Sequence, residues 1–86
     1  MKYKRPHKVP WRVVEGKAVL VSVKNSQVLV FNEVGTSIWE FLDKERTVDD
    51  IVGHLLSEFD TDRSVAEKDA KGFLDSLQEK EIIDVK

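Results

Sequence analysis

The stretch that decides the fold is Gln27-Val28-Leu29-Val30-Phe31-Asn32-Glu33-Val34-Gly35-Thr36-Ser37-Ile38-Trp39, because the hydrophobic period changes within it. Residues 27–31 are mostly apolar and include two β-branched valines, as is typical of a strand. Asn32 is a good helix N-cap, and apolar residues recur at helical spacing from Val34 to Leu42. This change of period at one asparagine divides the chain into a β part and an α part.

The β part reads as a meander of three antiparallel strands, at 11–14, 17–23 and 27–31. Glu15-Gly16 is a signal for the first turn, and residues 24–26 supply the second. Because side chains alternate along a strand, one face of the middle strand carries Val19, Val21 and Val23, and the other carries Ala18, Leu20 and Ser22.

The α part reads as three helices. The first is broken by residues 43–46, and Thr47 and Asp50 form a capping box that starts the second. Apolar residues at 48, 51, 52, 55, 56 and 59 make this second helix amphipathic. Ser64 and Glu67 predict another capping box, opening a third helix that runs to about Lys80. Residues 82–85 form a short final strand or pack back on the core.

Segregated strands and helices indicate an α+β fold, with a three-stranded antiparallel sheet followed by three helices. A chain of 86 residues supports one modest core, so we expect a basic extended arm at 1–9 and a single domain at 10–86. The arm carries its positive charge on Lys2, Lys4, Arg5 and Lys8, beside His7. It is either a solvated tail or a contact for an acidic partner.

Composition excludes several classes of function. The absence of cysteine removes disulfides, thiol nucleophiles and thiolate metal sites. No apolar run is long enough for a membrane span, and no signal peptide is evident, so we expect a cytoplasmic protein without a membrane partner. A formal net charge of −2 gives no global attraction for nucleic acid.

Few side chains have the pattern of a catalytic or metal site. Asp50, His54 and Glu58 share a helical ridge, which could ligate a metal, but a boundary histidine among solvated acids is the simpler interpretation. We therefore expect no catalytic residue, metal or cofactor. Trp39 lies on an apolar helix face and is expected in the core. Trp11 either packs on the edge of the core or exposes an apolar surface that could bind a partner.

The residues from Val28 to Trp39 resemble the strand, asparagine and first-helix signature of the PqqD family. The ordered series continues with Leu42-Asp43, then 46–52, then a third helix similar from Val65 to Leu77, and it closes on Ile82-Ile83. The resemblance covers about residues 9–85. The chain departs from the family after the first helix, where Asp43-Lys44 replaces an Asp-Gly pair. It departs again at Glu81, where the family often has glycine.

The resemblance implies a winged-helix-like module, also called a precursor-peptide recognition element. Such modules bind the leader of a ribosomally made precursor peptide and present it to a modifying enzyme, often a radical S-adenosylmethionine enzyme. Main-chain bonding to an open sheet edge gives affinity, and side-chain pockets give register. By resemblance, the peptide-binding residues are expected on the third strand and third helix: Gln27, Val28, Leu29, Val30, Phe31, Val65, Asp69, Gly72, Phe73, Ser76 and Lys80.

The helix ridge of Val65, Asp69, Gly72, Ser76 and Lys80 has two interpretations. Small residues at 72 and 76 let a peptide backbone approach, or they pack against the protein's own strand. A glycine inside a helix costs about 1 kcal/mol relative to alanine, so one of these reasons is needed. The exposed sheet edge could also pair with a second copy to form a homodimer.

The alternative function is a winged-helix nucleic-acid binder or regulator. The charges of the third helix argue against it, because acidic residues repel phosphate. In and just after that helix, acids outnumber lysines: Glu67, Asp69, Asp75, Glu79 and Glu81 against Lys68, Lys71 and Lys80.

Overall fold

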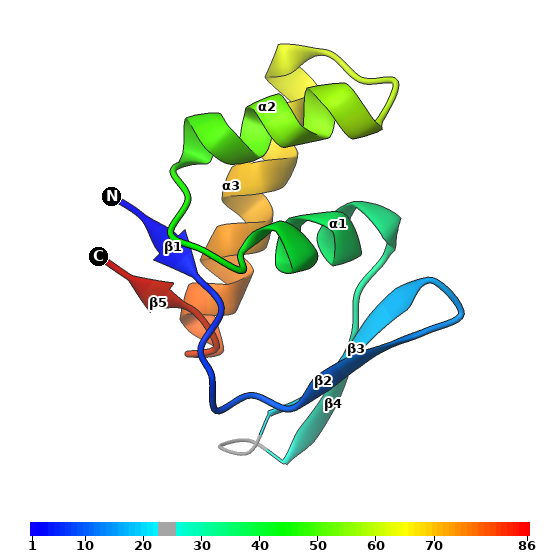
Figure 1. Cartoon of the computed structure of the whole chain (residues 1–86), viewed down its shortest axis with the longest axis vertical. Helices are drawn as coiled ribbons and strands as arrows, with labels where there is room; N and C mark the ends of the chain where they lie inside the picture. The colour runs from blue at the N-terminus through cyan, green and yellow to red at the C-terminus, as the bar shows by residue number, and fades with distance from the viewer. Residues whose placement is uncertain (23–25) are drawn as a thin grey trace.

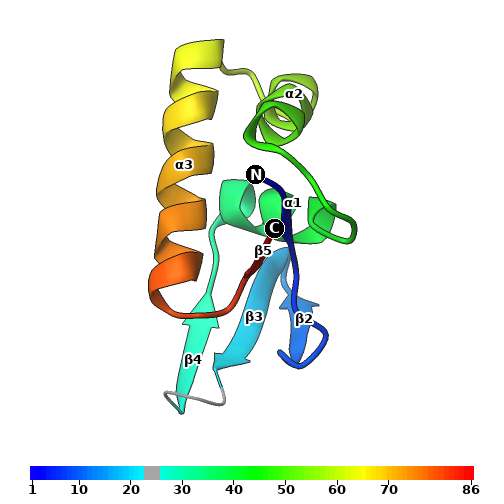
Figure 2. The ribbon, with the colours of Figure 1, turned by 90° about the vertical axis from the view of Figure 1, so that its left-hand side faces the viewer.

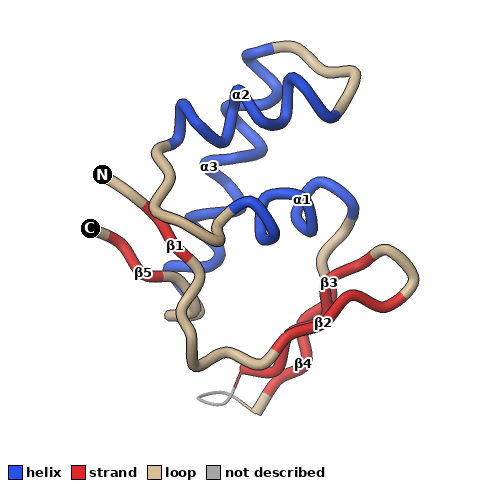
Figure 3. Tube along the Cα trace, viewed as in Figure 1, coloured by secondary structure: helices blue, strands red, loops and turns tan. Residues whose placement is uncertain are grey.

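The computed structural model describes residues 1–22 and 26–86, and it confirms the α+β class (Figure 1). One antiparallel sheet has the strand order β2-β3-β4, and a second, two-stranded sheet pairs β1 with β5. Strands β2, β3 and β4 lie together at one end of the molecule, whereas β1 and β5 lie beside the helices (Figure 3). The elements are β1 (Tyr3–Lys4), β2 (Trp11–Val14), β3 (Lys17–Ser22), β4 (Gln27–Val30), α1 (Glu33–Phe41), α2 (Val48–Glu58), α3 (Arg63–Glu79) and β5 (Asp84–Val85).

The three-stranded sheet has one face on the core and one face in solvent. Ala18, Leu20 and Ser22 are buried on the core side of β3, while Val21 on the other side is 44% exposed. Glu15 and Gly16 both have positive φ, so β2 and β3 are joined by the two-residue turn that suits a twisted hairpin. The predicted strand end at Val23 and the predicted turn at 24–26, apart from Ser26, lie outside the described residues.

Helix α1 is tied to the sheet by its first turn. The side chain of Asn32 accepts a hydrogen bond from the Gly35 amide at 2.8 Å, as its predicted capping role requires. Thr36 Oγ1 accepts a bond from the buried Ala18 amide at 2.8 Å, and it donates to the Phe31 carbonyl at 3.4 Å. One hydroxyl therefore bridges the ends of β3 and β4 and holds α1 against them.

Aromatic rings fill the layer between the sheet and α1. Trp39 is fully buried, as predicted, and meets Trp11 and Phe31 edge-on, with ring centroids 6.2 and 5.8 Å away. Trp11 is half-buried and packs on the core edge, and the Arg5 guanidinium covers its ring at 4.7 Å.

Helices α2 and α3 pack on each other and on α1 (Figure 2). The predicted capping box of Thr47 and Asp50 is present, with both reciprocal hydrogen bonds. The predicted capping box at Ser64 is wrong. Asp62 caps α3 instead, because its carboxylate accepts from the Val65 amide at 2.9 Å and the helix begins at Arg63.

The first residues are part of the folded body rather than a free arm. Tyr3 is buried, its amide donates to the Arg46 carbonyl at 2.7 Å, and the Arg46 amide donates back at 2.9 Å. Strand β1 pairs antiparallel with β5, while Ile82 just before β5 is buried. The chain end after α3 therefore both adds a strand and packs on the core, and the two termini lie side by side (Figure 1).

Arginine side chains complete the carboxyl end of α1. Arg5 Nη1 donates to the carbonyls of Trp39 and Glu40 at 2.8 and 2.9 Å, and Arg46 Nε donates to the Phe41 carbonyl at 3.0 Å. These carbonyls belong to the last turn of α1, where few backbone donors remain, and that of Trp39 also accepts from the Leu42 amide, at 3.2 Å. Two cations therefore help to satisfy them and complement the helix dipole. No helix among the described residues is long and apolar enough to cross a membrane.

Candidate functional site

Strand β4 is an open edge of the sheet. It pairs with β3 on one side, and no other strand of the described residues lies on its other side. The Phe31 amide donates to the Ala18 carbonyl at 3.0 Å, which fixes the alternation of the ladder. The backbone groups of Leu29 therefore face β3, whereas those of Val28 and Val30 face away from it. Two residues thus offer N–H and C=O groups to an added strand.

A hollow of about 450 Å³ lies beside the end of this strand, between α1 and α3. Its apolar lining comes mainly from side chains of both helices, and charged and amide groups stand among them. The lining residues are Asn32, Val34, Gly35, Ile38, Lys68, Asp69, Gly72 and Phe73. Three of the predicted site residues, Asp69, Gly72 and Phe73, therefore lie together in one hollow.

The two glycines of this hollow differ in their surroundings. A Cβ on Gly72 would meet no atom within 4 Å, so packing against the protein's own strand is not the reason for this glycine. A Cβ on Gly35 would lie 3.0 Å from Phe73 Cε1 and 3.2 Å from Phe31 Cβ. Helix α1 is therefore packed tightly here, while the α3 side keeps an open surface at the position of a helix-weakening glycine.

Phe31 and Phe73 connect the strand to α3. Their rings meet edge-on with centroids 4.8 Å apart, and both side chains are half-buried. This pair places the end of β4 next to the middle of α3, as the predicted site requires. A peptide on the edge of β4 would therefore run toward the hollow.

The remaining predicted site residues lie in two groups. Gln27, Val28 and Val30 are exposed along β4, and Leu29 is half-buried toward the core. On α3, Val65 is exposed and does not line the hollow, while Lys80 Nζ donates to Ser76 Oγ at 3.1 Å. The ridge below Gly72 thus carries a lysine folded back along the helix.

Sequence reasoning missed the contribution of α1 to the hollow. Asn32, Val34, Gly35 and Ile38 were expected only as helix cap and helix face, and Lys68 only as a charge. The signal that could have found this wall is Gly35, a glycine in the first turn of an apolar helix. Such a glycine indicates close approach by another element.

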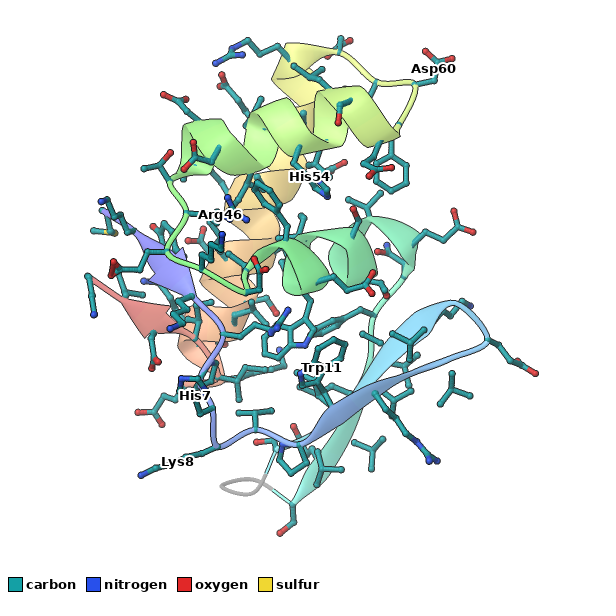
Figure 4. All side chains as sticks on the ribbon, viewed as in Figure 1. His7, Lys8, Trp11, Arg46, His54 and Asp60 are labelled. Carbon is teal, nitrogen blue, oxygen red and sulfur yellow. The ribbon has the colours of Figure 1, made fainter. Side chains whose placement is uncertain are left out.

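The neighbourhood of His54 is a packing cluster between α1 and α2 (Figure 4). His54 Nε2 lies 2.8 Å from Ser37 Oγ, and its ring stacks on Phe41 at 4.2 Å. The Arg46 guanidinium lies 3.9 Å from the same Phe41 ring, and its hydrogen bond to Asp43 lowers the pKa of that carboxyl. No group of three or more metal-ligating side chains occurs in the described part of the chain.

Comparison with known proteins identifies the family. The family model described as Coenzyme PQQ synthesis protein D (PqqD) matches residues 17–83. A search of the curated proteins gives no significant match.

Solved structures share the whole fold. The structure of TbiB1 in complex with the TbiA(beta) leader peptide is 25% identical, covers 96% of each chain and has a TM-score of 0.84. A lasso peptide synthetase B1 complexed with the leader peptide is 19% identical, with a TM-score of 0.83, over 99% of this chain and 100% of that one.

A third similar structure is the solution structure of the PqqD truncation of Methylobacterium extorquens PqqCD, described as a stand-alone RiPP recognition element. It is 22% identical, covers 98% of this chain and 89% of that one, and has a TM-score of 0.79. At this identity it shows the fold. With the family match over residues 17–83, these findings show that the chain belongs to the PqqD family.

Proposed function

We propose that this chain is a non-catalytic adaptor that binds the leader of a ribosomally made precursor peptide by strand addition to β4. It presents that peptide to a modifying enzyme, of the radical S-adenosylmethionine class by family resemblance, in the cytoplasm. The observation that carries the proposal is the open β4 edge next to a hollow with an open glycine on α3. The similar TbiB1 structure, which holds a leader peptide, supports it.

The chemistry of this site suits a peptide. Main-chain bonds from Val28 and Val30 provide affinity without regard to sequence, and the hollow accepts one side chain. Its apolar wall of Val34, Ile38 and Phe73 favours an apolar anchor residue. Lys68 and Asp69 are exposed and would contribute about 0–1 kcal/mol each to a charged neighbour.

The nucleic-acid alternative has less support. Helix α3 carries Glu67, Asp69, Asp75 and Glu79 against Arg63, Lys68 and Lys71, so its charge does not favour phosphate. Pairing of β4 with a second copy is a competing use of the same edge, and sedimentation at increasing concentration distinguishes it from peptide binding.

The test uses peptides selected from a random twelve-residue display library on the immobilised protein. When a selected peptide is added, the chemical shifts of the protein's backbone amides should change most at Val28, Val30 and around Gly72 in the hollow. Shift changes that avoid both β4 and the hollow would contradict the proposal.

A matched pair of glycine variants sharpens this test. Gly72→Ala adds a methyl group to the hollow and should weaken peptide binding by about tenfold, the cost of crowding a packed contact. Gly53→Ala on α2 also adds a methyl in open space, but outside the hollow, and should leave binding unchanged. Equal affinities for the two variants would mean that the peptide does not use the α3 side of the hollow.

A further inference from the structure

The outer face of the three-stranded sheet carries a group of valines next to Arg12 and Lys17, and it has no covering element among the described residues. Val28 lies opposite Val21, and Val30 lies opposite Val19, so these four valines share the face turned away from the core. Val28 and Val30 are 66% and 61% exposed. Contiguous exposed apolar side chains of this kind mark binding surfaces. We refer to Val19, Val21, Val28 and Val30 as the outer valine face.

A second hollow lies on this side of the sheet, separate from the one between α1 and α3. It has a volume of about 410 Å³ and is lined by Pro10, Trp11, Arg12, Val19, Val21 and Val28. Arg12 is the single charged residue in this lining. Val28 therefore stands between the open edge of β4 and an apolar hollow across the strands.

Val28 and Val30 belong both to the open edge of β4 and to the outer valine face. Val28 and Val30 direct their backbone groups toward an added strand, and their side chains toward the outer face. In a sheet, residues directly opposite each other point to the same face. A peptide strand bound to β4 therefore places its residues opposite Val28 and Val30, two positions apart, on the outer valine face. This holds for either direction of the peptide, because side-chain alternation is the same in both.

We propose that the outer valine face is a second recognition surface of the peptide site, which selects leaders with apolar residues at positions i and i+2. The residue opposite Val28 is the larger of the two, because Val28 itself lines the hollow and a long or aromatic side chain packed over Val28 meets its near side. Val21 lies one strand further on, two strand spacings or about 10 Å from the peptide. The inference rests on the proposed function, and it adds the chemical class of leader: a strand with apolar side chains on its outward face.

In this arrangement the bound peptide lies beside the outer valine face and enlarges it, and does not lie on top of it. The outward residues extend the row of valines sideways, and each cross-strand apolar pair contributes about 0.2–1 kcal/mol. The intervening peptide residue points to the inner side, toward α3. Specificity is then shared between two faces of one added strand, with the outward pair set by Val28 and Val30.

The experiment compares peptides selected from a random twelve-residue library by the wild-type protein and by Val28→Thr/Val30→Thr. Threonine keeps the β-branched shape and strand propensity but replaces a methyl group by a hydroxyl. Wild-type-selected peptides should carry apolar residues at i and i+2 and should bind the double variant about tenfold more weakly. Replacing both apolar residues of such a peptide by serine should weaken its binding to the wild-type protein by a similar factor.

The matched control is Val14→Thr. Val14 is 41% exposed on the same face, but it lies on β2 at the opposite edge of the sheet. Its replacement should leave peptide affinity unchanged within twofold.

Four outcomes would overturn the proposal. Selected peptides without the i, i+2 pattern, or equal affinity for the double variant, would remove the outer valine face from recognition while leaving strand addition intact. If the protein dimerises and the double variant weakens the dimer alone, the face belongs to a second copy. If no selected peptide perturbs the amides of β4, strand addition itself fails, and the inference falls with it.

Discussion

The two walls of the hollow beside β4 differ in how much space they leave for an added side chain. On the α1 side, Gly35 is buried, a Cβ added to it would lie only 3.0 Å from Phe73, and Thr36 bridges two strands. On the α3 side, Gly72 is exposed, and a Cβ added to it would meet nothing within 4 Å outside its own helix turn. One wall is therefore part of the core and resists substitution, while the other leaves space for a ligand. We call them the closed wall and the open wall.

The largest effect on stability is expected at Tyr3. Its backbone hydrogen bonds with Arg46 hold β1 beside the loop after α1, the helix that forms the closed wall. Tyr3→Ala removes a buried aromatic side chain and should lower the free energy of unfolding by about 3 kcal/mol. Chemical denaturation measures it. Tyr3→Phe keeps the ring and should stay within about 0.5 kcal/mol of wild type. If Tyr3→Ala has wild-type stability, the segment is a frayed tail.

A methyl group on the closed wall should destabilise the protein. Gly35→Ala places a Cβ 3.0 Å from Phe73 and 3.2 Å from Phe31, and the resulting overpacking should cost about 1–2 kcal/mol after the gain in helix propensity. Thermal unfolding should show a lower midpoint, whereas Gly72→Ala and Gly53→Ala should raise it. If all three variants move in the same direction, the two walls do not differ in packing.

Strain at the end of α3 offers a way to change stability without touching either wall. Glu81 has a φ of +57°, and the Ile82 amide donates to the Leu77 carbonyl at 3.0 Å. This geometry is a Schellman motif, in which glycine is the usual residue. Glu81→Gly should therefore stabilise the fold by about 0.5–1 kcal/mol, measured by chemical denaturation, and leave peptide affinity unchanged.

Glu81→Ala serves as the comparison for this variant, because it removes the carboxylate without easing the backbone. A gain equal to that of Glu81→Gly would assign the effect to the side chain instead of the backbone.

The smallest effect concerns pH. The hydrogen bond from the Thr47 amide lowers the pKa of Asp50 from its usual 3.8. Because the folded-state pKa is the lower one, this stabilisation is present above the unfolded pKa and is lost as pH falls through the folded pKa. The difference in unfolding midpoint between wild type and Asp50→Asn should therefore shrink below about pH 4. A difference in unfolding midpoint that stays constant from pH 7 to pH 2 would contradict this role of the Asp50 carboxylate.

Local signals predicted most of the fold. Asn32, Thr47 and Asp50 act on amides three residues away or closer, so their capping roles were readable from spacing alone. The start of α3 was misplaced because Asp62 and Ser64 are both good caps, and sequence does not show which side chain reaches an amide. The open edge of β4 followed from the meander itself.

Non-local contacts explain what the sequence left out. The pairing of Tyr3 with Arg46 and with Val85 joins segments far apart in the chain, each too short to show a strand period. The closed wall likewise depends on Phe73 meeting Gly35 across two helices. Gly72 was chosen because it and Ser76 are small residues on one ridge of the third helix, and the cost of a glycine inside a helix supported that choice.

The pairing of the chain ends has a consequence for protein engineering. The Lys2 amide donates to the Lys86 carbonyl at 2.7 Å, and the Lys86 amide donates to the Lys2 carbonyl at 2.8 Å. Since both ends lie in one hydrogen-bonded ladder, a few added residues can link them into a ring, with a new opening cut at the exposed Glu15-Gly16 turn. By the same geometry, the domain can be spliced into a surface loop of another protein through two adjacent junctions, at residues that belong to neither β4 nor its hollow.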